Sequence, residues 1–153
     1  MVFTKASSTS SIVRLNCFSF VLEIGGVEMA SFRKCSGVES ETETIEYKEA
    51  TKDGKMIIRK VPGAMKWSDI TLERRIDESK ALWEWRKQVE DGDVDTARRN
   101  GSIVINDSQK KEVARWNFER GWVSKWTGPE LDAGSNEVAT EKLVLTHEGL
   151  HRA

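Results

Sequence analysis

The sequence ends with LTHEGLHRA, in which His147, Glu148 and His151 have the spacing H-E-x-x-H. In zinc metallopeptidases this spacing on a helix brings two imidazoles to one metal ion, and the glutamate acts as general base. The chemistry that the three residues would support is zinc-assisted hydrolysis.

The residues around this motif predict the end of a strand instead of a helix. The preceding KLVLT alternates and is rich in strand-favouring residues, and Gly149 separates the two histidines. A zinc site also needs a third protein ligand, but only two residues follow His151, and these are the only His residues. Cys17 and Cys35 do not form a Cys-x₂₋₄-Cys ligand pair. We therefore predict no catalytic residues, no metal site and no cofactor.

Other features do not point to an enzyme either. The sequence has no G-x-S-x-G nucleophile elbow, and its many carboxylates do not single out a catalytic pair. With 24 Lys+Arg against 25 Asp+Glu, it has no bulk cationic charge that would hold nucleic acid. No segment approaches the roughly 18 apolar residues of a membrane span, so we expect no stable membrane insertion.

The 153 residues fit one domain. Residues 1–16 are rich in Ser and Thr and lack the compact apolar segment of a secretion signal, which predicts a flexible N-terminal arm before a domain over 17–153. Without a secretion signal, Cys17 and Cys35 are expected to be reduced.

The domain is expected to be mainly β (α+β), with short antiparallel strands and one inserted helix. FSFVLEIGGVEMASF alternates on both sides of Gly25-Gly26, which predicts a hairpin with a two-residue turn. In WSDITLERRI, the alternation places Ile70, Leu72 and Ile76 inward.

The helix is predicted within ESKALWEWRKQVEDG. Residues 77–79 supply an N-cap and an acidic first turn, and Gly92 fits the position just after the helix. Leu82 and Trp85 share an apolar stripe, but Trp83 lies about 160° around the helix from Trp85. Trp83 therefore either covers the margin of the core or contacts a partner.

The segment VESETETIEYKE alternates without an apolar face. One face carries Glu41, Glu43, Ile45 and Tyr47, and the other carries Thr42, Thr44, Glu46 and Lys48. Because neither face could lie on a core, the segment is either a solvated loop or edge hairpin, or a strand with water on one side and another subunit beside it. The next apolar run, in DGKMIIRKVPG, is expected to stop at Pro62-Gly63.

Three tryptophans suggest an alternative function. Trp116, Trp122 and Trp126 fall in a predicted hairpin, with Trp122 and Trp126 on one face, as in the stacking platforms of some carbohydrate-binding β-sandwiches. The alternative is therefore a monomeric sugar-binding module, although aromatic residues are also ordinary members of a sheet core.

Several stretches together resemble one family along about residues 18–150. They are FSFVLEIGGVEMASF, SGVESETETIEYKE, RKVPGAMKWSDITLERRI, ALWEWRKQVEDG, RRNGSIVIND and VARWNFERGWVSKWTGPELDAGSNEVATEKLVLTHEGL. Taken together and in this order, the stretches are similar to the tail-tube proteins of contractile, T4-like phages. Their residues are most similar to those of the inner tube proteins of extracellular contractile injection systems. Residues 1–16 and the two cysteines have no counterpart in this resemblance.

The resemblance implies a small antiparallel barrel or sandwich with one helix, assembled as a hexameric ring whose strands are shared between neighbours. Stacked rings would form a hollow, non-catalytic tube, able to carry effector cargo and driven through a target envelope by sheath contraction. The implied partners are further copies of the chain, sheath, baseplate or spike, and tube-cap proteins, and DNA would only pass through if the particle is a phage. The tube would assemble in the cytoplasm of the producing cell and belong to an extracellular or virion-like particle.

Within such a tube, the two-sided polar strand would have one face in the lumen, which makes Glu41, Thr42, Glu43 and Thr44 candidate lumen residues. Loop 48–63 is expected to contact the next ring, because an unpartnered loop would not carry such apolar residues. The candidate interface residues are Ile45, Tyr47, Met56, Ile57, Ile58 and Trp83.

Overall fold

The computed structural model describes residues 19–130, 133–134 and 138–153, so the predicted arm 1–16 lies outside the described residues. The strands are β1 (Ser19–Ile24), β2 (Val27–Phe32), β3 (Lys34–Ser36), β4 (Ser40–Ala50), β5 (Met56–Trp67), β6 (Ile70–Arg75), β7 (Arg99–Asn106), β8 (Glu112–Thr127), β9 (Thr140–Thr146) and β10 (Gly149–Arg152). The helices are α1 (Ala81–Glu90) and α2 (Val94–Ala97). The mainly β class is confirmed, but α2 is a second helix that the sequence did not lead us to expect. No helix in the described part of the chain has the length and apolarity to cross a membrane.

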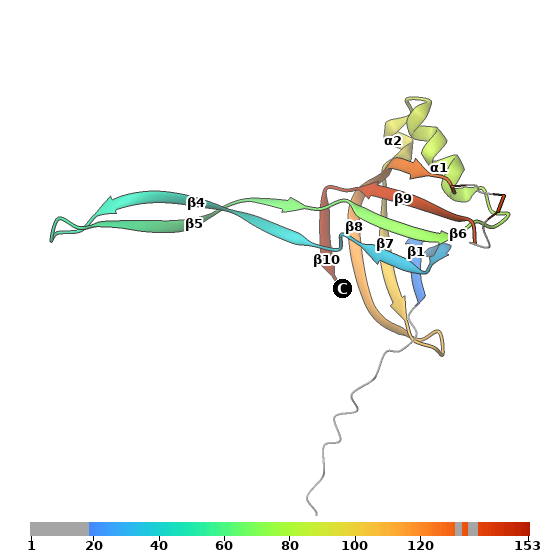
Figure 1. Ribbon diagram of the computed structural model, residues 1–153, viewed down its shortest axis with the longest axis horizontal. Helices are drawn as coiled ribbons and strands as arrows, with labels where there is room; N and C mark the ends of the chain where they lie inside the picture. Colours follow the sequence, from blue (N-terminus) through green and yellow to red (C-terminus); the bar gives the residue numbers. More distant parts are fainter. Residues whose placement is uncertain (1–18, 131–132, 135–137) are drawn as a thin grey trace, which may run out of the picture.

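The body of the molecule is one antiparallel sheet with the order β2-β1-β7-β8-β9-β6-β3, and β10 also pairs with β8. Within the described residues, this sheet does not close into a barrel, because β2 and β3 remain its outer strands. It is strongly curved: β7 and β8 run down the view of Figure 1, whereas β6 and β9 run across it. The curvature brings the end of β2 to β6, where the Arg33 N–H donates to the Glu73 carbonyl at 3.0 Å.

The long strand β8 produces this curvature. Its first part pairs with β7 and β10, and its second part pairs with β9. The change of partner falls at Arg120 and Gly121, where Arg120 has φ 51 and its N–H donates to Asn100 Oδ1 at 2.9 Å. The predicted tryptophan hairpin is therefore wrong, because one bent strand of 16 residues serves two halves of the sheet.

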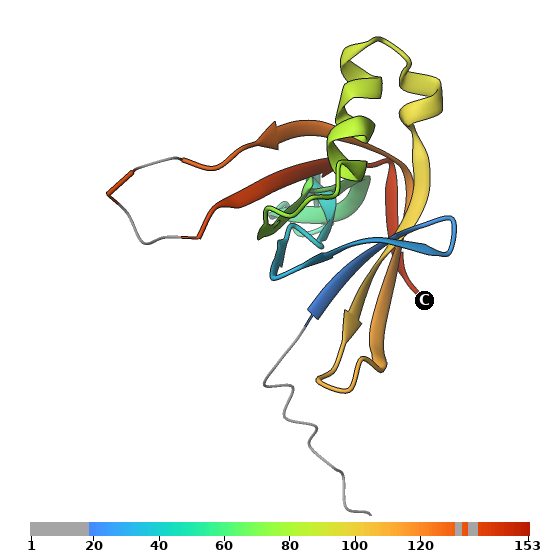
Figure 2. The ribbon, with the colours of Figure 1, turned by 90° about the vertical axis from the view of Figure 1, so that its right-hand side faces the viewer.

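The core lies between the curved sheet and α1, which stands above β8 in Figure 2. The expected helical stripe is confirmed, since Leu82 and Trp85 are buried and Trp85 Nε1 donates to the Ala97 carbonyl at 2.6 Å. Gly92 follows the helix with φ 82, as expected for a residue that must be left-handed. At the other end, the N-cap is Lys80, outside the predicted residues 77–79, and it makes no side-chain cap.

The inward face of β6 differs from the predicted one at a single position. Ile70 and Leu72 are buried as expected, but the third inward residue is Arg74, and Ile76 is exposed. The strand ends at Arg75, so the alternation no longer applies to Ile76. Arg74 is accommodated because Glu141 on the adjacent strand β9 neutralises its charge.

The other sheet is the two-stranded hairpin of β4 and β5, which projects far from the body in Figure 1. Its turn, at residues 51–55, includes Gly54 with φ 76. The expected break at Pro62-Gly63 is wrong: β5 continues through both residues to Trp67. Pro62 is tolerated because it pairs with Thr44 beside a register shift, in a hairpin whose edges are unpaired.

Candidate functional site

The projecting β4–β5 hairpin contains most of the residues that the sequence singled out. Loop 48–63 does not exist as a loop; its residues form the outer half of this hairpin. Every residue of β4 is exposed. Large apolar side chains are exposed on both strands, namely Ile45, Tyr47, Met56, Ile58, Val61 and Met65. Neither Val61, which lies within the predicted loop 48–63, nor Met65, which lies beyond the expected break at Pro62-Gly63, was singled out from the sequence.

The strand alternation predicted for β4 is confirmed by its pairing with β5. One face carries Glu41, Glu43, Ile45, Tyr47 and Glu49 together with Ile57, Arg59, Val61 and Lys66. The other face carries Thr42, Thr44, Glu46, Lys48 and Ala50 together with Met56, Ile58, Lys60, Pro62 and Met65. The candidate lumen residues are therefore divided between two faces, and so are the candidate contact residues of β5.

Contacts within the hairpin are polar and exposed. Arg59 pairs with Glu49 at 3.1 Å, Lys60 with Glu46 at 3.6 Å, and Lys66 with Glu43 at 3.8 Å. Exposed pairs contribute about 0–1 kcal/mol each. An isolated two-stranded hairpin is marginally stable in water, so this one is suited to gain stability by packing against another chain.

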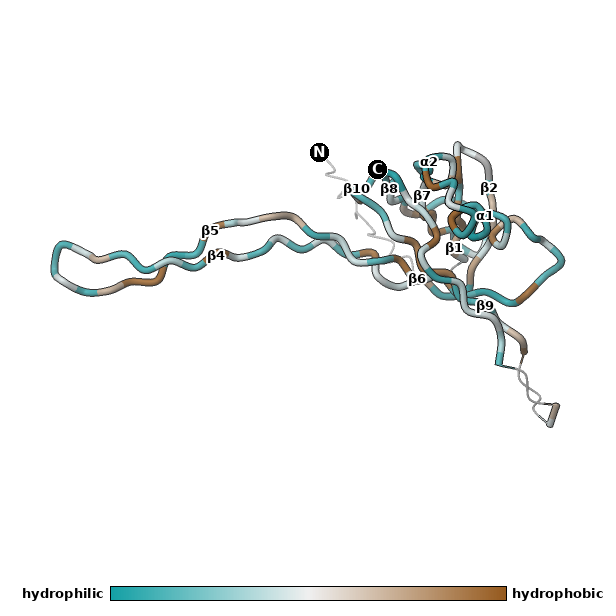
Figure 3. Tube along the Cα trace, turned by 90° about the horizontal axis from the view of Figure 1, so that it is seen from above, coloured by the Kyte–Doolittle hydropathy of each residue, from teal (hydrophilic) through white to brown (hydrophobic). Residues whose placement is uncertain are grey.

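One contact explains the glycine inside β5. A Cβ at Gly63 would lie 3.0 Å from both the Glu43 carbonyl and Ile45 Cγ1. Ile45 therefore lies over the glycine and covers the backbone there. Figure 3 shows hydrophobic stretches on this hairpin, well away from the body of the molecule. The hairpin thus presents an ordered surface in which apolar and charged residues alternate.

Trp83 lies elsewhere, on α1. It is 43% exposed and packs edge-on against Trp126 of β8, with ring centroids 4.8 Å apart. Trp126 in turn donates its Nε1 hydrogen to Glu141 Oε2 at 3.0 Å. Trp83 therefore covers the margin of the core, and any contact with a partner would use only its exposed edge.

The sugar-stacking platform predicted for Trp122 and Trp126 does not form. Trp122 pairs with Thr146, whereas Trp126 pairs with Leu143, and a register shift lies between Val123 and Lys125. This irregularity puts the two indoles on opposite faces of the sheet, because Leu143 and Thr146 themselves lie on opposite faces. The basis of the carbohydrate-binding alternative is thereby lost.

His147 and Glu148 follow strand β9, in agreement with the predicted end of a strand, whereas His151 belongs to a further strand, β10, that the sequence did not predict. His147 is buried, with Nδ1 and Nε2 each 3.1 Å from a carbonyl oxygen, those of Gly149 and Ser68. His151 is exposed on β10, and Glu148 pairs with Arg120 at 2.7 Å. Within residues 19–130, 133–134 and 138–153, no three His, Cys, Asp or Glu side chains are grouped as metal ligands. His147 instead connects the β9–β10 bend to the base of the hairpin.

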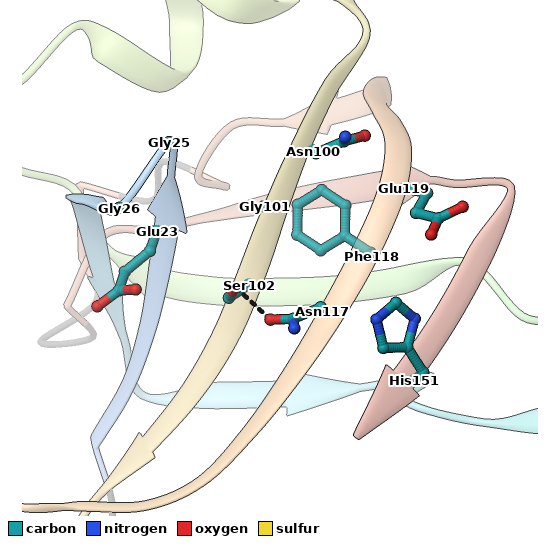
Figure 4. A pocket seen from close by; sticks show the side chains of 10 residues that line it. All are labelled: Glu23, Gly25, Gly26, Asn100, Gly101, Ser102, Asn117, Phe118, Glu119 and His151. Atoms are coloured by element: carbon teal, nitrogen blue, oxygen red, sulfur yellow. Dashed lines mark hydrogen bonds between the residues drawn. The ribbon is translucent and has the colours of Figure 1, made fainter. Parts of the chain in front are cut away.

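A shallow pocket of about 330 Å³ lies between the β1–β2 turn, β7, β8 and β10 (Figure 4). Its Ser102 donates to Asn117 Oδ1 at 2.7 Å, so the hydroxyl faces an amide and no general base activates it. Glu23 is engaged by Arg115 at 2.6 Å, and hydrogen bonds to Glu23 and Glu112 raise the pKa of Arg115. Phe118 lies against Gly101 at one side of the pocket. The arrangement is that of a packed sheet surface.

Comparison with known proteins agrees with the resemblance seen in the sequence. The family described as T4-like virus tail tube protein gp19 matches residues 16–151. No curated protein sequence gives a significant match.

Several solved structures share this fold. The chain is 25% identical to a chain in the anti-feeding prophage cap (AFP tube terminating cap), with a TM-score of 0.69 over 88% of this chain and 87% of that one. It is 19% identical to a chain of an extracellular contractile injection system, the PVC sheath-tube complex in the extended state, with a TM-score of 0.72 over 99% of both chains. Hcp1 from Flavobacterium johnsoniae shares 16% identity and a TM-score of 0.50 over 88% of this chain and 94% of that one.

Proposed function

The chain belongs to the T4-like virus tail tube protein family, and from this membership we propose that it is the inner-tube subunit of a contractile injection system. The observation that carries the proposal is the projecting β4–β5 hairpin, which is ordered as two strands although every residue of β4 is exposed. A hairpin of this kind is stable when another chain covers it. In a tube, that chain is a second copy.

The open sheet supports assembly as a ring. Its outer strands β2 and β3 leave edges that a neighbouring subunit can pair with, and such pairing removes exposed edges. Head-to-tail contacts of this type close into a ring when the rotation closes and also propagate along an axis. We assign a hexameric ring, with strands of each subunit continuing into those of its neighbours.

The hairpin is assigned to contacts between rings. At about 3.3 Å per residue, the 11 residues of β4 extend roughly 36 Å. Adjacent strands of a sheet lie only about 4.8 Å apart, so the hairpin is long enough to reach across several strands of another subunit. Ile45, Tyr47, Met56, Ile57 and Ile58 contact the next ring in this proposal, and the exposed edge of Trp83 contacts a partner on the outside. Near the body, one face of β4 lines the lumen, either that of Glu41 and Glu43 or that of Thr42 and Thr44.

The remaining partners follow from the similar structures. Those come from a sheath-tube complex, a tube terminator, a baseplate and a tube cap. We propose that this tube likewise contacts a sheath, a baseplate or spike, and a cap, and that its lumen carries effector cargo. The role is structural and not enzymatic. Assembly takes place in the cytoplasm of the producing cell, and the finished particle acts outside it.

The proposal is tested by electron microscopy of the purified full chain over a range of concentrations, alone and with its sheath and baseplate proteins. Rings with six subunits, stacking into tubes of constant diameter, are expected. Mass photometry of the same samples counts the subunits in each ring. A sample that stays monomeric under all of these conditions contradicts the tube assignment, and rings of another size contradict the hexamer.

A further inference from the structure

A second pocket, of about 510 Å³, lies where the curved sheet brings β2 near β6. Three arginines line it, Arg33 just after β2 and Arg74 and Arg75 at the end of β6, together with Ser19 and Ser31. These residues come from three separate strands or their ends. The Ser31 hydroxyl donates to Glu28 Oε1 at 3.1 Å. We propose that this pocket binds a phosphate-class oxyanion, either free or carried by a larger ligand.

The charges in the pocket are only partly neutralised. Arg74 is 5% exposed, and its Nε and Nη1 donate to Glu141 and Asp77. Asp77 also lines the pocket, and its other oxygen accepts the Ser79 N–H at 2.8 Å. These two carboxylates therefore serve Arg74 and the local backbone.

Arg33 and Arg75 remain without a carboxylate within ion-pair distance among the described residues. Among the described residues, the three arginines against Asp77 and Glu141 leave this region with one net positive charge. A phosphate monoester carries about −1.5 to −2 charge at pH 7, which is opposite in sign to the net charge of the pocket.

The donor types also suit a phosphate group. Guanidinium groups donate in a planar fork that matches phosphate oxygens, and Arg–phosphate hydrogen bonds are among the stronger ones in proteins. Arg74 Nη2 has no partner within the described residues and belongs to a buried, positioned side chain that lines the pocket. Ser19 adds a hydroxyl at the first residue of β1. Bound phosphate would join the β1–β2 hairpin to β6 across the gap in the sheet.

Equilibrium dialysis of the full chain against radiolabelled inorganic phosphate, at constant ionic strength, tests this site. We expect saturable binding of one phosphate per chain. In the double variant Arg33→Gln/Arg75→Gln, we expect the dissociation constant to rise at least about tenfold, because two charge-assisted contacts are lost. Both side chains are exposed, so this variant should fold.

The matched control is Arg59→Gln/Arg120→Gln, which removes the same charge from two exposed arginines that already have carboxylate partners. It should bind phosphate within about twofold of the unchanged chain, since it leaves the pocket intact. Arg75→Lys keeps the positive charge but loses the planar guanidinium group that can donate two hydrogen bonds to phosphate, so this variant should bind phosphate more weakly. Equal loss in both double variants, no saturable binding, or equally effective displacement by acetate would each overturn the phosphate assignment. Tube formation is scored separately and has no bearing on this outcome.

Discussion

Arg74 of β6 and Glu141 of β9 form an ion pair inside the sheet, with side chains only 6% and 10% exposed. The two residues lie directly opposite each other in the strand pairing. Arg74 also donates to Asp77, and Glu141 also accepts from Trp126. The pair therefore connects β6 and β9 with β8 and with the segment that leads into α1. Position 74 faces the core, where strand alternation predicts an apolar residue, but it is occupied by an arginine whose charge Glu141 neutralises.

Breaking this pair should destabilise the fold strongly. Arg74→Met leaves Glu141 buried without its partner, so we expect a loss of about 3–5 kcal/mol in the free energy of unfolding, measured by urea denaturation. Arg74→Met/Glu141→Leu should lose much less, because no charge is left unpaired. The exposed pair Arg59–Glu49 is the control, and its removal should cost at most about 1 kcal/mol. A double variant as unstable as the single one would contradict this account.

The two histidines of H-E-x-x-H should behave differently. His147→Ala should reduce the free energy of unfolding by about 1–3 kcal/mol, because His147 is buried against the carbonyls of Ser68 and Gly149. His151→Ala, at an exposed position, should change it by about 0.5 kcal/mol or less. Thermal denaturation with and without a chelator measures both. Stoichiometric zinc that either substitution removes would instead restore the metal-site interpretation.

Gly101 should not tolerate a side chain. A Cβ there would lie 2.6 Å from both the Glu23 carbonyl and Phe118 Cζ, so Gly101→Ala should cost about 1–3 kcal/mol of stability. Gly149→Ala is the control, because its nearest atom, Glu119 Oε2, would be at an ordinary 3.7 Å. In a double-mutant cycle, Gly101→Ala should cost less in a Phe118→Leu background. Equal costs in both backgrounds would mean that Phe118 is not the obstacle.

Charges at the outer half of the hairpin should prevent tube formation without unfolding the subunit. Ile57→Asp/Ile58→Asp puts carboxylates on both faces of β5, where the proposal places the next ring. Circular dichroism should show an unchanged melting temperature, and electron microscopy should show no tubes. Val113→Asp tests an exposed apolar residue outside the hairpin and should leave tubes intact. Tubes of unchanged length in the Ile57→Asp/Ile58→Asp variant would contradict the assignment of the hairpin to contacts between rings.

Cys35 should react slowly with alkylating reagents. Burial raises the pKa of its thiol from 9.0 to about 11, which lowers the thiolate fraction near pH 8.5 by roughly 100-fold. Iodoacetamide labelling of a Cys17→Ser variant, folded and in denaturant, measures this difference. Because the unfolded thiol ionises first, stability should also fall as pH rises from 9 to 11, a loss that Cys35→Ser should lack. Equal labelling rates in both states would contradict the burial of this thiol.

Local alternation determined much of the fold. The inward Ile70 and Leu72, the helical stripe of Leu82 and Trp85, and the left-handed Gly92 all lie where the sequence predicted them. These features depend on residues a few positions apart, through the fixed periods of strand and helix. The same alternation correctly separated the two faces of β4.

Other features depended on strand partners that the sequence does not specify locally. The register shift between Val123 and Lys125 moves Trp126 to the opposite face from Trp122. Pro62-Gly63 continues a strand because β4 runs beside it, with Ile45 covering the glycine. The arginine pocket depends on the curvature of the sheet, which brings together residues 19, 33 and 75 from separate strands.

The sequence by itself thus determined the mainly β class, the resemblance to the tail-tube family and the polar, two-faced character of β4. The tertiary structure decided that β4 and β5 project as one hairpin, that the sheet stays open within the chain, and which side chains share a face or a pocket. The physical reason is that backbone periodicity is local, whereas register, bulges and curvature are set by pairing between strands far apart in the chain.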